Sequence, residues 1–342
     1  MHPVPLVETT RGYPDTGQVT ENVHMGSVAV ADAGGKLLWY AGNPDAVVFT
    51  RSALKPFQGL PFVLADGPAR LGLSSAQLAL LCASHSGEQS HLAAVAAILD
   101  LAGCAESELA CGCHAPLYYD SVGLAPPPGQ QWRPLHHNCS GKHSGFLAWC
   151  RLHDVPAAGY LDPGHRLQQE IRRTLAAALA VPESSMPIGM DGCSAPNYAL
   201  PLSRLAQLYA RLASGHADPQ FGAAMGELRS AMTAHPDLVS GQGRCDLAYM
   251  TAGAGDWVSK VGADALQAIG IKAAGLGIVV KIADGAPRAL HTAVYSVLEQ
   301  LGLLDDSQRR QLAHYRQPPL TNARGSTVGQ VRAVFTLQRA PG

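Results

Sequence analysis

FTRSALKPFQ, residues 49–58, is the stretch in which the expected secondary structure changes from strand to helix. The apolar residues 47–49, two valines and a phenylalanine, lead into it and are typical of a strand end, and the apolar residues after it are spaced as in a helix. Pro56 is tolerated in a first helical turn, where its missing N–H removes no hydrogen bond. We therefore expect Ser52 at a strand-to-helix turn, at the head of the helix.

Ser52 and Lys55 form a Ser-x-x-Lys pair at this turn. Side chains three positions apart lie on one face of a helix, so the Lys55 amine could reach the Ser52 hydroxyl and act as its base. A lysine is a base near neutral pH only if burial or a nearby cation lowers its pKa from about 10.4. Backbone N–H groups at the helix head would favour a developing oxyanion. The motif is short, however, and a serine there also serves as an ordinary helix cap.

The composition limits the class of protein. The chain has 342 residues, 47% of them apolar, which is ample material for a buried core. A formal net charge of -1 leaves no electrostatic footprint for nucleic acid. Residues 1–5 lack the basic and apolar regions of a signal peptide, and no apolar run is long enough to cross a membrane. We expect a cytoplasmic protein with no nucleic-acid or membrane partner, whose cysteines are thiols or metal ligands rather than a disulfide framework.

The order of the expected elements predicts an α/β (α+β) fold. Strands come first, helices fill the middle, and strands return near residue 256. Two groups of strands far apart in sequence are most simply joined in one antiparallel sheet with the helices as a layer beside it. We expect a single domain over residues 1–342, with the sheet from 1–50 and 256–337 and a mostly helical region over 51–250. The expected strands are 21–32, 36–42, 46–49, 256–262, 265–272, 276–283 and 328–337, and the expected helices are 52–64, 75–83, 90–102, 141–153, 165–180, 202–214, 219–234 and 287–303.

Three further polar stretches stand out. LCASHSGE, residues 81–88, reads either as a capped helix boundary or as a source of a second hydroxyl, Ser84. HHNCSGKHSG, residues 136–145, has a density of His, Cys and Lys that no core requires, and its Cys139 is a good soft ligand for zinc. MDGCSAPN, residues 190–197, carries another cysteine and an aspartate. No CxxC or HExxH spacing is present, so spacing alone gives little support for a zinc site. We expect the remaining cysteines to be buried thiols: Cys82, Cys104, Cys111, Cys113, Cys150 and Cys245.

Lys260 lies on the first strand expected after the helical region. A lone lysine on a strand is commonly an edge-strand charge. The functional alternative is that its ammonium faces the nucleophile from the sheet, where it would lower the pKa of a neighbouring lysine or attract an anionic substrate.

Taken together, these stretches resemble the L-asparaginase II family, the Rhizobium etli type. The resemblance rests on SALK at 52–55, SHSGE at 84–88, HNCSGKHSG at 137–145, DGC at 191–193 and KVGAD at 260–264. The long block around Cys139 is the most specific of them.

This resemblance, which covers residues 8–302, implies a fold similar to serine β-lactamases and penicillin-binding proteins. It implies two Ser–Lys pairs, which fall on Ser52 with Lys55 and on Ser84 with Lys260. It also implies hydrolysis of L-asparagine to L-aspartate and ammonia by a homodimer. The implied zinc ligands are Cys139, Lys142 and Cys193. A lysine ligand is unusual, because the amine must lose its proton before it binds metal.

On charge grounds alone, Arg51, His85 and Asp191 are the candidates for holding the substrate's carboxylate and ammonium groups. Zinc would then fix loops or orient substrate rather than activate water, because the serine already supplies the nucleophile. Two other functions remain open: a β-lactamase-like serine esterase or peptidase, and a non-catalytic zinc-stabilised binding protein.

Overall fold

The computed structural model describes residues 2–13, 17–215 and 218–341, which divide into two compact units. We call them the sheet unit (Met1–Val48, Leu200–Ala210 and Ser259–Gly342) and the helical unit (Phe49–Ala199 and Arg211–Val258). Each unit is built from segments that are separate in the sequence, so the chain passes from one unit to the other several times. That residues 1–342 form a single domain stays a prediction.

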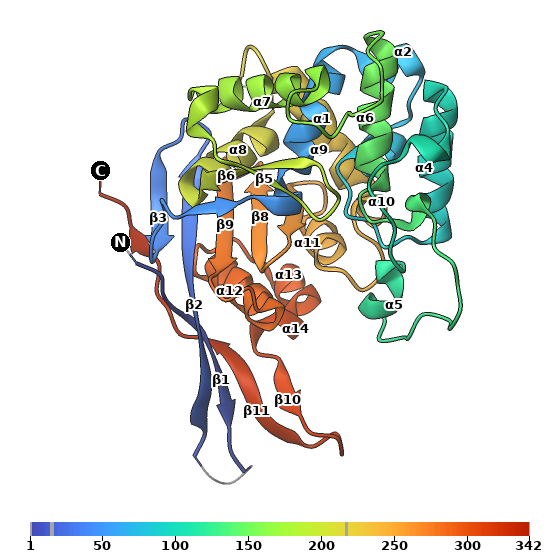
Figure 1. The fold of residues 1–342 in the computed structure, drawn as a ribbon. Coiled ribbons are helices and arrows are strands. Elements are labelled where there is room, and N and C mark those ends of the chain that lie inside the picture. Colours follow the sequence, from blue (N-terminus) through green and yellow to red (C-terminus); the bar gives the residue numbers. More distant parts are fainter. Residues whose placement is uncertain (1, 14–16, 216–217, 342) are drawn as a thin grey trace. The chain divides into compact units, whose positions relative to one another are not determined.

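The sheet unit contains a nine-stranded sheet. Its main path runs β10-β11-β1-β2-β9-β8-β7, and β3 joins β2 while β12 joins β3. The expectation that N- and C-terminal strands meet in one antiparallel sheet is confirmed, since β2 pairs antiparallel with β1 on one side and with β9 on the other (Figure 1). The strands are β1 (Val4–Arg11), β2 (Val19–Asp32), β3 (Leu37–Ala41), β7 (Trp257–Gly262), β8 (Leu266–Ile271), β9 (Leu276–Ile282), β10 (Pro319–Thr321), β11 (Thr327–Ala333) and β12 (Gln338–Arg339).

The second half of β2 is the core of this sheet. Val28, Ala29, Val30 and Ala31 are all fully buried, so side chains on both faces of the strand are covered. Such a continuous apolar run is typical of a strand that is buried on both faces. A strand with one solvent-exposed face would show polar and apolar residues in alternation. The helices of the sheet unit are α12 (Pro287–Gln300), α13 (Asp306–Gln311), α14 (Ala313–Arg316) and the first turns of α8 (Leu202–Ser214), of which α12 packs on β9, β1, β8 and β11.

The helical unit packs its helices around α1, which contacts α6, α7 and α9. Every helix expected in the middle of the sequence is present, with shifts of a few residues at the ends. The unit also holds strands β5 (Ile188–Met190) and most of β6 (Pro196–Pro201), which were not expected, in a small sheet of order β4-β6-β5 with β4 (Val47–Phe49). Its helices are α1 (Lys55–Leu64), α2 (Gly67–Leu71), α3 (Ser75–Leu81), α4 (Gln89–Ala102), α5 (Leu117–Ser121), α6 (Ser140–Leu152), α7 (Arg166–Leu179), α9 (Gly222–Ala234), α10 (Pro236–Val239) and α11 (Cys245–Gly253).

Two details bear on the sequence analysis. In the part of the chain that the structure describes, no helix has both the length and the apolar character needed to cross a bilayer. The expectation that the cysteines outside the zinc set are buried is wrong for Cys113, which is exposed. Cys113 lies in the irregular segment before α5, which also contains the buried Cys111.

Gly277 generates the first prediction, because β9 and the start of α8 approach each other closely there. A Cβ added at Gly277 would collide with the backbone of Ala206 and Ala210. Gly277→Ala is therefore expected to lower the free energy of unfolding by about 1–3 kcal/mol. Urea denaturation measures the loss, and Gly17→Ala is the control, since a Cβ there meets nothing within 4 Å. Equal stability of the two variants would contradict this packing.

Candidate active site

Ser52 lies at the predicted strand-to-helix turn. It belongs to a short 3₁₀ helix, η1 (Arg51–Leu54), between β4 and α1, and its side chain is half-buried. The turn is anchored by Thr50, whose backbone N–H and Oγ1 both donate to the carbonyl of Tyr198 on β6, at 3.1 and 2.9 Å. The position of Ser52 is therefore set by β6 as well as by its own helix.

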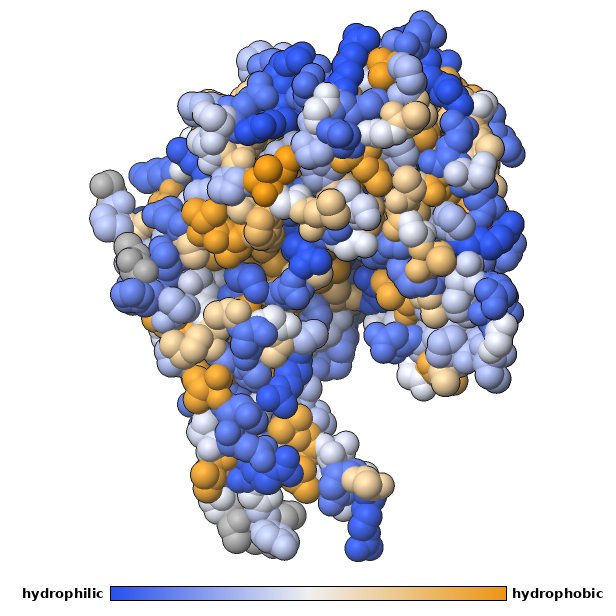
Figure 2. Space-filling model, in the orientation of Figure 1, coloured by the Kyte–Doolittle hydropathy of each residue, from blue (hydrophilic) through white to orange (hydrophobic). Residues whose placement is uncertain are grey.

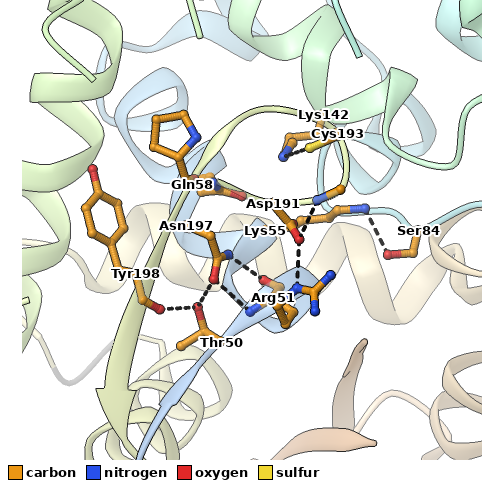
Figure 3. A network of polar contacts seen from close by, with 12 residues as sticks. Thr50, Arg51, Lys55, Gln58, Ser84, Lys142, Asp191, Cys193, Asn197 and Tyr198 are labelled. Carbon is orange, nitrogen blue, oxygen red and sulfur yellow. Dashed lines mark hydrogen bonds and ion pairs between the residues drawn. The ribbon is translucent and has the colours of Figure 1, made fainter. Parts of the chain in front are cut away.

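Two of the residues predicted to bind substrate meet directly beside Ser52. Arg51 Nε donates to Asp191 Oδ1 at 2.8 Å, as Figure 3 shows. Burial alone would raise the pKa of the Asp191 carboxyl, but the charge of Lys142 and the hydrogen bond from Arg51 outweigh it and lower that pKa. Asp191 is thus a carboxylate at neutral pH, and a cationic and an anionic group stand together next to the serine.

The buried amine of Lys55 contacts a second predicted catalytic residue. Lys55 Nζ donates to Ser84 Oγ at 2.8 Å and to the carbonyl of Ala83 at 2.5 Å (Figure 3). These two hydrogen bonds join the amine to the segment that follows α3, and the expected action of Lys55 on Ser52 stays a prediction. The structure therefore brings Lys55 and Ser84 together, with Ser52 three positions from Lys55 along the chain.

His85 is buried and both of its ring nitrogens are occupied. The N–H of Gly87 donates to Nδ1 at 3.1 Å. Ser140 Oγ gives its proton to the carbonyl of Leu135, so it accepts from His85 Nε2, 2.8 Å away. Burial, followed by the positive charge of nearby groups that include Lys55, holds the pKa of His85 well below its ordinary value. His85 is a neutral, fixed side chain here, and its role in substrate binding stays a prediction.

The three predicted zinc ligands also come together. Cys139 lies at the start of α6 and Lys142 on its first turn, and Lys142 Nζ is 3.0 Å from Cys193 Sγ (Figure 3). Hydrogen bonding with Cys193 is the largest effect on Cys139 and lowers the pKa of this thiol well below its ordinary value, although burial opposes it. Burial also acts to lower the pKa of Lys142, but the charges of Cys193 and Cys139 outweigh it and raise that pKa. The lowered pKa of Cys139 and the raised pKa of Lys142 favour a thiolate beside an ammonium.

His143 supplies a test of whether this cluster suits a metal. It follows Lys142 on α6, and its Nδ1 is 2.7 Å from the hydroxyl of Tyr160, which itself accepts the N–H of Ala110 at 2.8 Å. Its Nε2 is buried without a hydrogen-bond partner of normal geometry among the described residues, while Cys193 is near enough to act on the pKa of the ring. The two sulfurs and the amine of the predicted set are donors that zinc accepts, and the unsatisfied ring nitrogen of His143 lies near one of those sulfurs, so the residues fit the predicted ion.

Other groupings of metal-binding type do not appear. Within the described residues, no three or more His, Cys, Asp or Glu side chains are arranged to hold a metal ion. The predicted set differs from such groups because a lysine is one of its members. The zinc site therefore stays a prediction.

Lys260 belongs to the sheet unit. It is buried on β7, and its Nζ donates to the carbonyl of Val261 at 3.0 Å. Its partnership with Ser84 stays a prediction, as do the catalytic roles of Ser52, Lys55 and Ser84.

Sequence reasoning missed Asn197. This residue closes the stretch 190–197, which drew attention only for its cysteine and aspartate. In the structure its side-chain amide is buried and bonds to the backbone of Arg51 on both sides (Figure 3). No pattern in the sequence connects residues 51 and 197, because their contact depends on the pairing of β6 with the turn.

Comparison with known proteins adds one finding. A family described as L-asparaginase II matches residues 7–333 of the chain. A search among curated proteins gave no match.

The buried histidines generate a prediction on acid stability. Burial, the largest effect, lowers the pKa of His143 to about 4 from an ordinary value of 6.5. Between these values the unfolded chain binds the proton that the folded chain refuses, so the stability present above pH 6.5 is lost as the pH falls towards 4. The loss from His143 is at most about 3 kcal/mol.

Urea denaturation of the metal-free protein at pH 7 and pH 5 measures this loss, and His143→Asn should reduce it. The control is His314→Asn at an exposed position, which should leave the difference between the two pH values as in wild type. A loss that is the same in all three proteins would contradict the burial of a neutral His143.

Proposed function

The chain belongs to the L-asparaginase II family, and on this premise we propose that it is an amidohydrolase that converts L-asparagine to L-aspartate and ammonia. The observation that carries the proposal is the family match over residues 7–333, which contains every residue of the candidate site. The finer assignment of an L-asparaginase acting through serine and lysine is supported by the cluster described above.

Recognition of the substrate is assigned to the pair beside the serine. A guanidinium binds a carboxylate through parallel hydrogen bonds, so Arg51 suits the α-carboxylate of asparagine. The ionised Asp191 suits the α-ammonium group. In this proposal the Arg51–Asp191 bond at 2.8 Å is exchanged for bonds to the two charged groups of the substrate.

The proposed reaction begins with attack by Ser52 Oγ on the side-chain amide carbon. Lys55 in its neutral form takes the hydroxyl proton, and the oxyanion of the tetrahedral intermediate is stabilised by backbone N–H groups at the start of η1. The C–N bond breaks, and the proton passes to the leaving nitrogen as ammonia departs. Water then attacks the resulting ester with the same base, which releases aspartate and restores Ser52. The contact of Lys55 with Ser84 supports a relay in which Ser84, with Lys260, returns the proton.

Cys139, Lys142 and Cys193 are proposed to hold a zinc ion. Such an ion supplies Lewis acidity and a fixed geometry when it is bound. In this chain the fixed geometry is the property proposed to matter. Cys193 lies two positions from Asp191 on the same loop, so a bound ion would hold that loop in place. Lys142 must lose its proton to enter the set, and the sulfurs of Cys139 and Cys193, which favour that proton in this structure, would then be available to the metal as thiolates.

The assembly and the finer fold are also proposals. The order of strands, helices and strands agrees with a likeness to serine β-lactamases and penicillin-binding proteins. A homodimer is supported by exposed apolar side chains on β2, namely Val19, Val23 and Met25. Figure 2 shows apolar surface low in the view, over the strands labelled β1, β2 and β11 in Figure 1. A cytoplasmic location is kept as an expectation.

An assay of ammonia release by the purified protein tests the function. L-asparagine should be turned over and should be preferred to L-glutamine, because the Arg51–Asp191 pair and Ser52 are held at a fixed separation by the backbone. Turnover of a chromogenic ester or a β-lactam without ammonia release would favour the serine esterase alternative. Inertness towards amides and esters would favour a binding protein.

The nucleophile is tested with Ser52→Ala. The variant should lose at least about 1,000-fold in kcat, because the reaction has no other acyl acceptor. Its free energy of unfolding should stay within about 0.5 kcal/mol of wild type, since the side chain is only half-buried. The control is Ser90→Ala, at an exposed serine of α4. A folded Ser52→Ala protein with near-wild-type ammonia release would remove Ser52 from the mechanism.

The metal is tested with Cys193→Ser. A hydroxyl is a much poorer zinc ligand than a thiolate, so the affinity for zinc should fall by at least about 10-fold. Zinc content per chain after dialysis is the measurement. Cys113→Ser, at the exposed cysteine, should keep the wild-type content. Full zinc content in Cys193→Ser would rule this residue out as a ligand.

A further inference from the structure

The side-chain amide of Asn197 holds the backbone of the residue that precedes the proposed nucleophile. Asn197 Oδ1 accepts the N–H of Arg51 at 3.0 Å, and Nδ2 donates to the carbonyl of Arg51 at 3.0 Å. The hydroxyl of Thr50 lies 3.4 Å from the same Oδ1. Asn197 is only 1% exposed and lies on β6. The next residue of that strand, Tyr198, accepts the hydrogen bond from Thr50 (Figure 3). Both backbone polar groups of Arg51 are therefore satisfied by one rigid amide.

The backbone of Arg51 needs these hydrogen bonds because its conformation is unfavourable. Its φ is 49°, in the left-handed region that residues other than glycine avoid. Glycine would adopt this conformation freely, but glycine has no guanidinium with which to contact Asp191. Arg51 thus has an arginine side chain on a backbone conformation that glycine prefers. The two hydrogen bonds from the amide of Asn197 stabilise that conformation.

The torsion angles of Arg51 decide where the next residue points. A change of Arg51 to the right-handed or extended region would redirect the N–H and the Cα–Cβ bond of Ser52, although η1 and α1 could remain intact. We propose that Asn197 is a positioning residue that fixes the left-handed backbone of Arg51 and thereby aims Ser52 Oγ and N–H at the scissile carbonyl. This inference rests on Ser52 being the nucleophile of the proposed function.

A cycle of variants separates this role from ordinary buried hydrogen bonding. R51A and R51G both remove the guanidinium, but only R51G removes the cost of the left-handed conformation. Adding N197A to R51A is expected to lower the rate of Ser52 acylation by about 10-fold or more. Adding N197A to R51G should lower it less than about 3-fold, since glycine holds the conformation unaided.

The acylation rate is followed by intact mass with p-nitrophenyl acetate as the probe, and kcat and KM for asparagine are measured in parallel. The matched control is Gln58→Ala, which removes a buried amide that bonds to the carbonyl of Pro196 on the same strand at 3.1 Å. Its effect on acylation should be the same in R51A and R51G. The N197A effect on asparagine turnover should appear in kcat rather than in KM.

Equal effects of N197A in R51A and R51G would overturn the proposal, as would an unchanged acylation rate in both. If N197A prevents folding of R51A, the proposal requires R51G to restore a folded protein, and failure of both to fold counts against it. Failure of the proposed function is recognised separately. In that case asparagine is not hydrolysed or S52A is acylated like wild type, whatever the cycle gives.

Discussion

Two buried lysine amines constrain the helical unit. Lys55 and Lys142 are each no more than 2% exposed, and an amine in that position is tolerated only when it has polar partners. Lys55 is met by the carbonyl of Ala83 and the hydroxyl of Ser84, while Lys142 is met by the sulfur of Cys193. These partners come from segments that lie far from the lysines in sequence. The need of these two amines for polar partners therefore brings the segment after α3 and the loop before β6 against α1 and α6.

Three side chains from residues 191–197 form hydrogen bonds with other parts of the candidate site. Asp191 takes the guanidinium of Arg51, Cys193 takes the amine of Lys142, and Asn197 takes the backbone of Arg51. The loop has a left-handed residue of its own at Ser194, directly after Cys193. A change at the proposed metal cluster therefore acts on the same short segment that holds the proposed nucleophile.

Local patterns in the sequence predicted the helices and the turn at Ser52, because apolar spacing and Pro56 act over a few residues. The hydrogen bond from Lys55 to Ser84 could not be predicted, since the choice of partner depends on how α3 packs beside α1. Strand β6 was missed because PNYALP has proline at both ends and no alternation of polar and apolar residues. It becomes a strand through its pairing with β4 and β5 and its contacts with the turn. The resemblance to a family supplied the full zinc set and the pairing of Lys260 with Ser84, which spacing alone did not.

The arrangement of the sheet has a consequence for how the chain folds during synthesis. Strand β2 is synthesised before its partner β9, which follows some 250 residues later, with Val28 opposite Val280. Until then the apolar edge of β2 is open to other chains, as an unpaired strand edge generally is. The segment 49–199 contains most of the helical unit, and its packed helix pairs, α4 with α6 and α1 with α7, lie closer together in the sequence than β2 and β9 do. We expect the helical unit to fold first, during synthesis. Chaperones are then expected to bind the β1–β2 hairpin until β9 has been synthesised.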